Sequence, residues 1–567
     1  MGNKIVLLRR VVLQITVILL TVALTTGAAA AVNQPDSGSA LNQVNQSQPP
    51  LPEEKAEEVT IQETPVSIPA DNHQKIHVAG FRFSGETILP EKELLSLVNE
   101  KTAQDLSLSD LYGFADRVTR YLVRKGYPVA SAYIPAQHIK EGIVTIAVVP
   151  GKFGAIRIDN QTRIPTVRLQ KILAVLAPGA IITQKNLERA MLLLNDLSGV
   201  KAQASLKPGE SAGTSDLAVE VADTAIAGGN IYADTWGNRY TGSARSGVQL
   251  TLYNFDYLGD EFRLGGMSSL KGMDNCSFDY SLPLSGNGLQ LNLDCNTVGY
   301  TLGEDFAALD ATGQAQVYGL ELSYPFIRSR GFNLSGKAGF EVKELKDDIG
   351  STGTFNPRTS HLWHLALTGN AIDSGRGGGA NSFALTIYGG SLDICDSAAY
   401  GADAAGANSA GWFGKAVLDF RRNQSLCPGL NLELRCTGQL ATKNLDSSEK
   451  FYLGGADGVR AYPQGEGSGD QGCRLTAEVE WRLPGTAGDR EHLYLVGFCD
   501  YGYLNINENP WSSAANSRSL SAFGIGLIYT WNSFYLRCDY AWKLGDTAAT
   551  SDADQPGRFW IRAVKNF

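Results

Sequence analysis

From about Gly228 to Phe567, hydrophobic and polar residues alternate along short segments that are separated by Gly, Asn, Asp and Ser. A period of two is typical of β-strands that keep one face in an apolar environment. Roughly 340 residues at about 21 per strand and connection give 16 strands, if each strand spans about 10 residues. Charged residues recur on the other face, as in Glu433 with Arg435. The pattern therefore predicts an all-β transmembrane barrel of 16 antiparallel strands over residues 225–567, with a water-filled lumen.

Two segments before the barrel repeat one plan. Phe81-Arg82-Phe83 recurs as Ile156-Arg157-Ile158, and Leu89-Pro90 recurs at the same offset as Ile164-Pro165. Each copy is predicted as strand, helix, helix, strand, strand. In the first copy, the first strand is predicted as a single strand from Ile76 to Ser84. We therefore expect two α+β modules, at residues 75–150 and 151–224. Such modules leave a strand edge that can pair with an extended chain; two plain spacer domains are the alternative.

The N-terminus has the pattern of a secretory signal. A basic start with Lys4, Arg9 and Arg10 precedes an apolar core from Val11 to Leu24 and a small-residue region from Gly27 to Ala31. We expect residues 1–31 to be a signal peptide that is cleaved on export. Residues 32–74 are rich in Gln, Asn, Ser and Pro, which is typical of a linker because such a composition buries no core.

Composition narrows the choice of function. The formal net charge is −9 and the isoelectric point is about 5.4, which argues against a nucleic-acid-binding protein. The mean hydropathy of −0.12 does not exclude a barrel, since alternation hides the apolar face. Six of the eight cysteines alternate in phase with apolar residues, and none has metal-ligand spacing. We interpret them as structural and mostly unpaired.

A Gly-rich segment from Tyr452 to Pro463 carries a single arginine, Arg460. Two predicted strands follow it, Cys473 to Trp481 and Tyr494 to Tyr501. In the second strand Asp500 shares a face with Val496 and Phe498, and in a barrel this face would line the lumen. A buried carboxylate needs a partner, so the sequence predicts an ion pair between Arg460 and Asp500.

These residues also resemble a known family. Gly458-Val459-Arg460-Ala461-Tyr462 resembles the VRGY loop motif of the Omp85 superfamily, with Ala461 in place of the second glycine. Phe498-Cys499-Asp500 resembles the strand motif F-x-D of that superfamily. The two modules resemble POTRA domains, and Asp234 to Gly242 resembles the first barrel strand. The whole chain resembles the two-partner-secretion transporters (TpsB) of the FhaC/ShlB/HecB type.

The resemblance implies further features. A loop around residues 452–472 would fold into the barrel, where its arginine meets the strand aspartate. A short helix near the mature N-terminus would plug the pore, with Asp36 to Gln46 as the candidate. The protein would lie in the outer membrane of a diderm bacterium with its POTRA domains in the periplasm. It would translocate a large exported protein of the haemolysin, haemagglutinin or adhesin type to the cell surface.

The implied partners are this secreted client, outer-membrane lipid and lipopolysaccharide, and the barrel assembly machinery and periplasmic chaperones during biogenesis. The transporter would work as a monomer and bind no nucleic acid. Two other functions stay open: an Omp85-type assembly factor that inserts outer-membrane proteins, and a passive porin. Gly209 to Gly213 fits the G-x-S-x-G pattern but lies between two predicted strands, where a nucleophile elbow needs a helix. The sequence therefore predicts no enzyme, cofactor or metal site.

Overall fold

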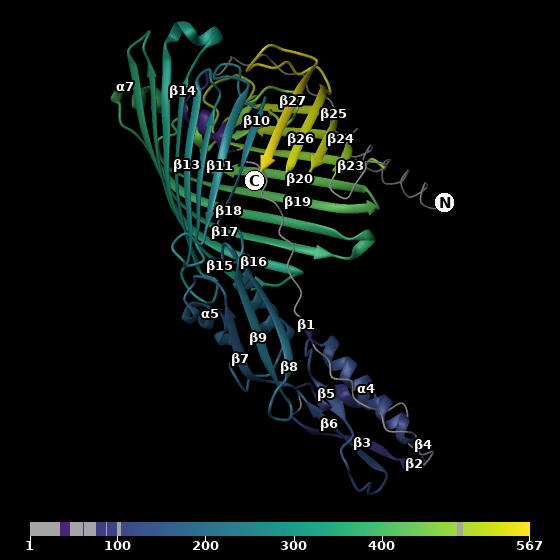
Figure 1. Ribbon diagram of the computed structural model, residues 1–567. Helices are drawn as coiled ribbons and strands as arrows, with labels where there is room; N and C mark the ends of the chain where they lie inside the picture. Colours follow the sequence, from purple (N-terminus) through teal and green to yellow (C-terminus); the bar gives the residue numbers. More distant parts are fainter. Residues whose placement is uncertain (1–33, 46–59, 62–74, 87, 99–103, 485–490) are drawn as a thin grey trace, which may run out of the picture.

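The computed structural model describes residues 34–45, 60–61, 75–86, 88–98, 104–484 and 491–567. The predicted signal peptide lies outside these ranges. No helix within them is long and apolar enough to cross a bilayer. Two small α+β modules lie one after the other below a large closed barrel (Figure 1).

Seven elements lie in the described residues of the first module. They are β2 (Lys75–Val78), β3 (Gly80–Gly85), α3 (Glu91–Ser96), β4 (Gln104–Ser107), α4 (Leu108–Arg124), β5 (Ser131–Tyr133) and β6 (Ile143–Val149). β6 lies between β3 and β5, and β2 pairs with β4. The single first strand predicted from the sequence is thus two strands, because Ala79 leaves the sheet and donates to the carbonyl of Gly142. Strand β4 was missed because its four residues are mostly polar.

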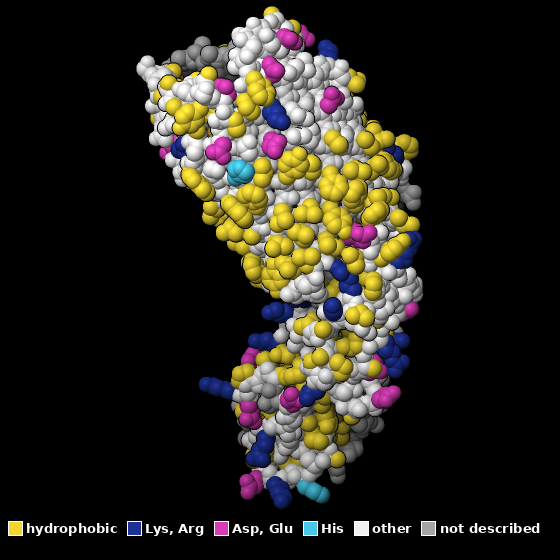
Figure 2. Space-filling view, turned by 90° about the vertical axis from the view of Figure 1, so that its left-hand side faces the viewer, with side chains coloured by type: hydrophobic (Ala, Val, Ile, Leu, Met, Phe, Trp, Pro, Cys, Tyr) yellow, Lys and Arg dark blue, Asp and Glu magenta, His cyan; other side chains and the backbone are white. Residues whose placement is uncertain are grey.

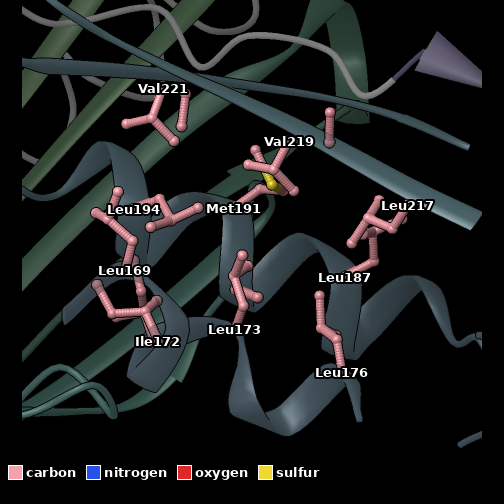
Figure 3. Packing of buried hydrophobic residues seen from close by; sticks show 14 of the residues in the cluster. Leu169, Ile172, Leu173, Leu176, Leu187, Met191, Leu194, Leu217, Val219 and Val221 are labelled. Atoms are coloured by element: carbon pink, nitrogen blue, oxygen red, sulfur yellow. The ribbon is translucent and has the colours of Figure 1, made fainter. Parts of the chain in front are cut away.

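The second module repeats the helix pair on a longer sheet. It contains β7 (Lys152–Asn160), α5 (Thr166–Leu173), η2 (Ala174–Leu176), α6 (Gln184–Asn195), β8 (Val200–Pro208) and β9 (Thr214–Asp223). Leu169, Leu194 and Val219 belong to the apolar core that joins the helices to the sheet (Figure 3). The sheet order is β1-β8-β9-β7, because β1 (Thr60–Ile61) pairs in parallel with the outer edge of β8.

Sixteen antiparallel strands form the barrel, and pairing of β10 with β27 closes it. They are β10 (Ala227–Asp234), β11 (Arg245–Tyr253), β12 (Glu261–Ser268), β13 (Met273–Pro283), β14 (Gln290–Thr301), β15 (Ala311–Arg328), β16 (Phe332–Ile349), β17 (Thr354–Asp373), β18 (Gly379–Ile394), β19 (Gly411–Cys427), β20 (Leu430–Ala441), β23 (Gln471–Arg482), β24 (Glu491–Asn505), β25 (Ser517–Trp531), β26 (Phe534–Lys543) and β27 (Gly557–Asn566). The predicted 16-stranded barrel is confirmed. The predicted first strand, Asp234 to Gly242, was wrong, because β10 ends at Asp234 and residues 235–244 connect it to β11.

The alternation of the sequence becomes the two faces of the barrel wall. On β24, Val496, Phe498 and Asp500 are buried in the interior, whereas Leu495 is 40% exposed on the outside. Figure 2 shows the outward hydrophobic side chains gathered in a broad band across the visible face of the barrel. All eight cysteines are free thiols.

Module two is fixed to the mouth of the barrel that faces it by side-chain contacts with the end of β15. Arg189 donates to the carbonyl of Pro325 at 2.9 Å. Arg328 at the end of β15 forms a two-contact ion pair with Asp196, with Nε–Oδ2 and Nη2–Oδ1 distances of 2.9 and 2.6 Å. The last module therefore lies directly against one side of the barrel opening.

Candidate functional site

The connection between β20 and β23, residues 442–470, folds back into the lumen; we call it the inner loop. It contains η5 (Ser447–Glu449) and the two short paired strands β21 (Phe451–Tyr452) and β22 (Ser468–Gly469). The loop turns back on itself, and its two limbs lie very close together at the turn: a Cβ at Gly458 would lie 2.1 Å from the carbonyl oxygen of Leu453. Glycine is needed at that position for the two limbs of the loop to approach.

Arg460 lies at the end of this return and is 2% exposed. Its Nε and Nη2 donate to the two carboxylate oxygens of Asp500, each at 2.8 Å. The backbone N–H of Arg460 also donates to Asp500, at 3.3 Å, and the Thr476 hydroxyl donates to Oδ1 of the same carboxylate at 2.9 Å. The structure thus brings together the two residues that the sequence paired, in the bidentate geometry that makes such contacts strong.

Two further carboxylates and a second arginine complete the cluster. Nη1 of Arg460 lies 2.8 Å from Glu478 Oε2 on β23 and 3.5 Å from Asp539 Oδ2 on β26. Arg537 binds the same two acids, at 2.8 and 2.7 Å. Two arginines and three carboxylates therefore alternate, so that each buried charge has a counter-charge.

Aromatic side chains hold the remaining faces of Arg460. Its guanidinium lies 3.3 Å from the centre of the Phe498 ring, which gives the phenylalanine of the strand motif a cation–π contact. Nε1 of Trp560 on β27 donates to the Arg460 carbonyl at 2.7 Å. Arg460 thereby attaches the loop to four strands near the C-terminus of the chain, β23, β24, β26 and β27.

The other residues of the loop motif lie outside the charged cluster and are held mainly by packing. Val459 and Ala461 are fully buried, and Val459 lies against Gly502 of β24, where a Cβ would come within 3.1 Å of its side chain. Tyr462 is also buried, and its hydroxyl donates to the Thr547 carbonyl at 3.0 Å. Sequence reasoning missed Glu478 and Trp560, although alternation places Glu478 on the lumen face of its strand.

Helix α2 (Ser37–Asn45) lies inside the barrel, within the segment predicted as a candidate plug. Ala40, Leu41 and Val44 pack against apolar lumen residues, among them Met273 and Tyr300. All three side chains are buried, so the apolar stripe of the helix faces the barrel wall.

Polar contacts fix the N-terminal end of α2. The N–H and hydroxyl of Ser37 donate to the two oxygens of Asp347, at 2.8 and 2.9 Å. Arg358 of β17 lies between Asp347, Asp446 of the inner loop and Asp36, whose carboxylate is 3.6 Å away. A carboxylate at a helix N-terminus is favourable because it meets unpaired N–H groups and the positive end of the dipole.

A chamber of about 1240 Å³ lies between module two and the lumen below α2. Leu41 and Asn45 border it on one side and the segment from Asn195 to Val200 on the other. Its barrel wall carries both charges, including Glu261, Arg263, Asp294, Glu321, Lys337 and Glu341. Across the described residues, no group of three or more His, Cys, Asp or Glu side chains is placed to hold a metal ion.

Comparison with known proteins agrees with this architecture. The family described as haemolysin secretion/activation protein ShlB/FhaC/HecB matches residues 213–528, and the ShlB-type POTRA domain matches residues 76–151. The heme/hemopexin transporter protein HuxB of Haemophilus influenzae strain 86-028NP is 27% identical over 486 residues, which cover 84% of each chain. The outer membrane transporter CdiB of Escherichia coli O6:K15:H31 is 23% identical over 320 residues, 54% of this chain and 53% of that one.

Two solved structures share the fold. CdiB from Escherichia coli superposes with a TM-score of 0.73 at 19% identity, covering 95% of this chain and all of that one. CdiB from Acinetobacter baumannii gives a TM-score of 0.61 at 17% identity, covering 100% and 98%. The chain therefore belongs to the ShlB/FhaC/HecB family of haemolysin secretion/activation proteins: it is an outer-membrane β-barrel transporter of two-partner secretion, with a POTRA domain in the periplasm.

Proposed function

We propose that the two modules capture one large exported client of the haemolysin, haemagglutinin or adhesin type and pass it through the barrel to the cell surface. The client would bind in extended form by adding a strand to an open sheet edge, which supplies main-chain hydrogen bonds without a sequence requirement. The client then folds outside, and its folding makes transport unidirectional.

The observation that carries this proposal is the chamber between module two and the lumen. It is bordered by module residues and barrel residues together, so a chain that leaves the sheet edge enters the lumen without crossing lipid. The acidic and basic side chains of the chamber wall suit a hydrated polypeptide better than an apolar ligand.

The sheet edge itself supports strand capture. Thr60 and Ile61 lie in parallel register beside Ser205 and Leu206 of β8, so one segment of this chain already uses that edge. A client strand would make the same kind of pairing along the rest of β8. Thr60 and Ile61 belong to the segment between helix α2 and module one, so a client strand that also covered Ser205 and Leu206 would have to displace them.

In the resting protein the inner loop and α2 would close the pore. Arg460 and Asp500 hold the loop in the position from which transport begins, and Arg358 with Asp347 holds the helix. The protein would act as a monomer in a bilayer of lipid and lipopolysaccharide, after delivery by periplasmic chaperones and insertion by the barrel assembly machinery.

The first test is deletion of the gene, followed by mass spectrometry of the culture supernatant, the cell surface and the outer-membrane proteins. Loss of one very large secreted or surface protein, with other barrels unchanged, is the expected result. A broad fall in outer-membrane barrels would instead identify an assembly factor. Complementation with Arg460→Ala and with Asp500→Ala should restore the barrel but not secretion, because each leaves a buried charge without its partner.

A further inference from the structure

Glu466 follows Arg460 in the inner loop, but its side chain binds a different part of the barrel. The residue is fully buried. Its main-chain carbonyl accepts hydrogen bonds from Leu453 and Gly454 in the opposite limb of the loop, at 3.3 and 2.8 Å. Its carboxylate contacts residues 544–556, which join β26 to β27 on the side of the barrel away from the modules; we call this segment the outer connection.

Both oxygens of the Glu466 carboxylate are filled by donors. The N–H of Thr550 lies 3.0 Å from each oxygen, and the N–H of Ser551 lies 2.7 Å from Oε2. The Thr550 and Ser551 hydroxyls add contacts of 2.9 and 2.5 Å, and Arg518 of β25 forms an ion pair with Oε1. Five donor groups directed at one buried carboxylate make the contact depend on its negative charge.

Neighbouring residues strengthen the same connection. The hydroxyl of Tyr462, also in the inner loop, donates to the Thr547 carbonyl at 3.0 Å. Arg518 donates to the Ala548 carbonyl at 2.7 Å as well as binding Glu466. Tyr462, Arg518 and Glu466 therefore hold the outer connection at three successive points, and the inner loop supplies two of these three groups. Asp552 and Asp554 of the outer connection make further ion pairs with Arg239 and Lys543, outside the inner loop.

We propose that Glu466 couples the inner loop to the outer connection, so that the two segments stay or leave together as one closure of the extracellular mouth. This rests on the proposed function, in which a client must pass that mouth. Arg460 holds the inner end of the unit, and its described contacts lie on β23, β24, β26 and β27 rather than on the outer connection. Glu466 is a positioning residue at the outer end.

The coupling has a direct consequence. If the two segments form one unit, release at Arg460 must loosen the outer connection, although the guanidinium contacts none of residues 544–556 in the described structure. If they are independent, only loss of Glu466 loosens it.

Hydrogen exchange of the full-length protein in detergent, followed by mass spectrometry, tests this directly. The readout is the exchange of the peptide that covers residues 544–556, which includes the Thr550 and Ser551 amides. We expect Glu466→Gln to speed this exchange at least about tenfold, because local opening sets the rate and the amide cannot satisfy the same donors. Glu466→Asp keeps the charge and should restore part of the protection. Asp546→Asn, which changes an exposed carboxylate in the same segment, should exchange as the wild type does.

Arg460→Ala is the decisive variant, and it should also speed exchange in residues 544–556. Exchange at the wild-type rate in that variant, with fast exchange in Glu466→Gln, would overturn the coupling. If Arg460→Ala yields no heat-modifiable barrel, Arg460→Lys replaces it and is judged by the same criterion. The exchange assay contains no client, so its result does not depend on secretion. If the wild-type protein secreted no client in cells, the proposed function would be refuted, but the coupling measured by exchange would stand.

Discussion

Gly38 of helix α2 lies directly against Ser447 of the inner loop. A Cβ at Gly38 would be 2.3 Å from the Ser447 hydroxyl oxygen and 2.4 Å from the backbone nitrogen of Ser448. The Asn42 side chain, one turn along the helix, donates to the Ser447 carbonyl at 3.0 Å. Only glycine allows this approach. The helix and the loop are therefore packed on each other inside the barrel.

Gly38→Ala should loosen the helix from the loop. Overpacking of a close contact typically costs about 1–3 kcal/mol, and here the neighbouring atoms belong partly to backbone that cannot turn away. We expect more frequent open-channel events when the purified protein is placed in planar bilayers. Asn45→Ala, at the exposed end of the same helix, is the matched control. Equal conductance of Gly38→Ala and wild type would show that α2 does not limit the pore.

Glu478→Gln should destabilise the inner loop without touching its sequence motif. Glu478 lies 2.8 Å from both Arg460 and Arg537, so its loss removes the negative charge between two buried guanidinium groups, which keep only Asp500 and Asp539 as close partners in the described structure. Breaking a buried ion pair costs about 3–5 kcal/mol. We expect faster proteolysis of the inner loop and reduced secretion from a barrel that still assembles. Glu480→Gln, on the same strand face but half-buried, should have a small effect; equal effects would argue against a specific role of Glu478.

Alternation along the chain was sufficient to predict the barrel and to place Asp500 on the lumen face, whereas the inward fold of the loop that carries Arg460 was implied by the family resemblance. The barrel and the position of Asp500 follow from local rules, since a period of two assigns each residue to a face, and a buried carboxylate needs a cation. The rest of the cluster depends on how strands far apart in sequence are registered. Alternation also places Glu480 in the lumen, and only the register of β23 with β24, which sets Thr476 opposite Asp500, brings Glu478 rather than Glu480 to the arginine.

The N-terminal helix and the split first strand show a second limit of the sequence. Ser37 to Asn45 contains Gly and Ser residues that disfavour an isolated helix, and its stability comes from Leu41 and from the cap that Asp347 supplies, more than 300 residues away. Strand β4 likewise forms through its pairing with β2, which its own four residues do not indicate. Tertiary partners decide such segments, so no local pattern reveals them.

Arg460→Lys separates charge from geometry. A lysine keeps the positive charge but presents one ammonium group, which cannot hold both oxygens of Asp500, reach Glu478 and stack on Phe498 at once. We expect secretion by the lysine variant to fall to nearly the level of Arg460→Ala. The measurement is the amount of client in the supernatant per assembled barrel. Near wild-type secretion by Arg460→Lys would mean that charge alone positions the loop.

Docking of module two onto the barrel should depend on the pair formed by Asp196 and Arg328. Their side chains are 31% and 26% exposed, so solvent screens the contact and we expect it to contribute about 1 kcal/mol or less. Asp196→Asn and Arg328→Gln should each reduce secretion moderately, because the module would no longer be held against the chamber. The double variant should be no worse than either single one, since both changes remove the same interaction. Asp223→Asn, an exposed carboxylate at the end of the same module, should leave secretion unchanged. A double variant whose loss equals the product of the two single losses would show that the residues act separately, and that docking rests on contacts such as Arg189 with the Pro325 carbonyl.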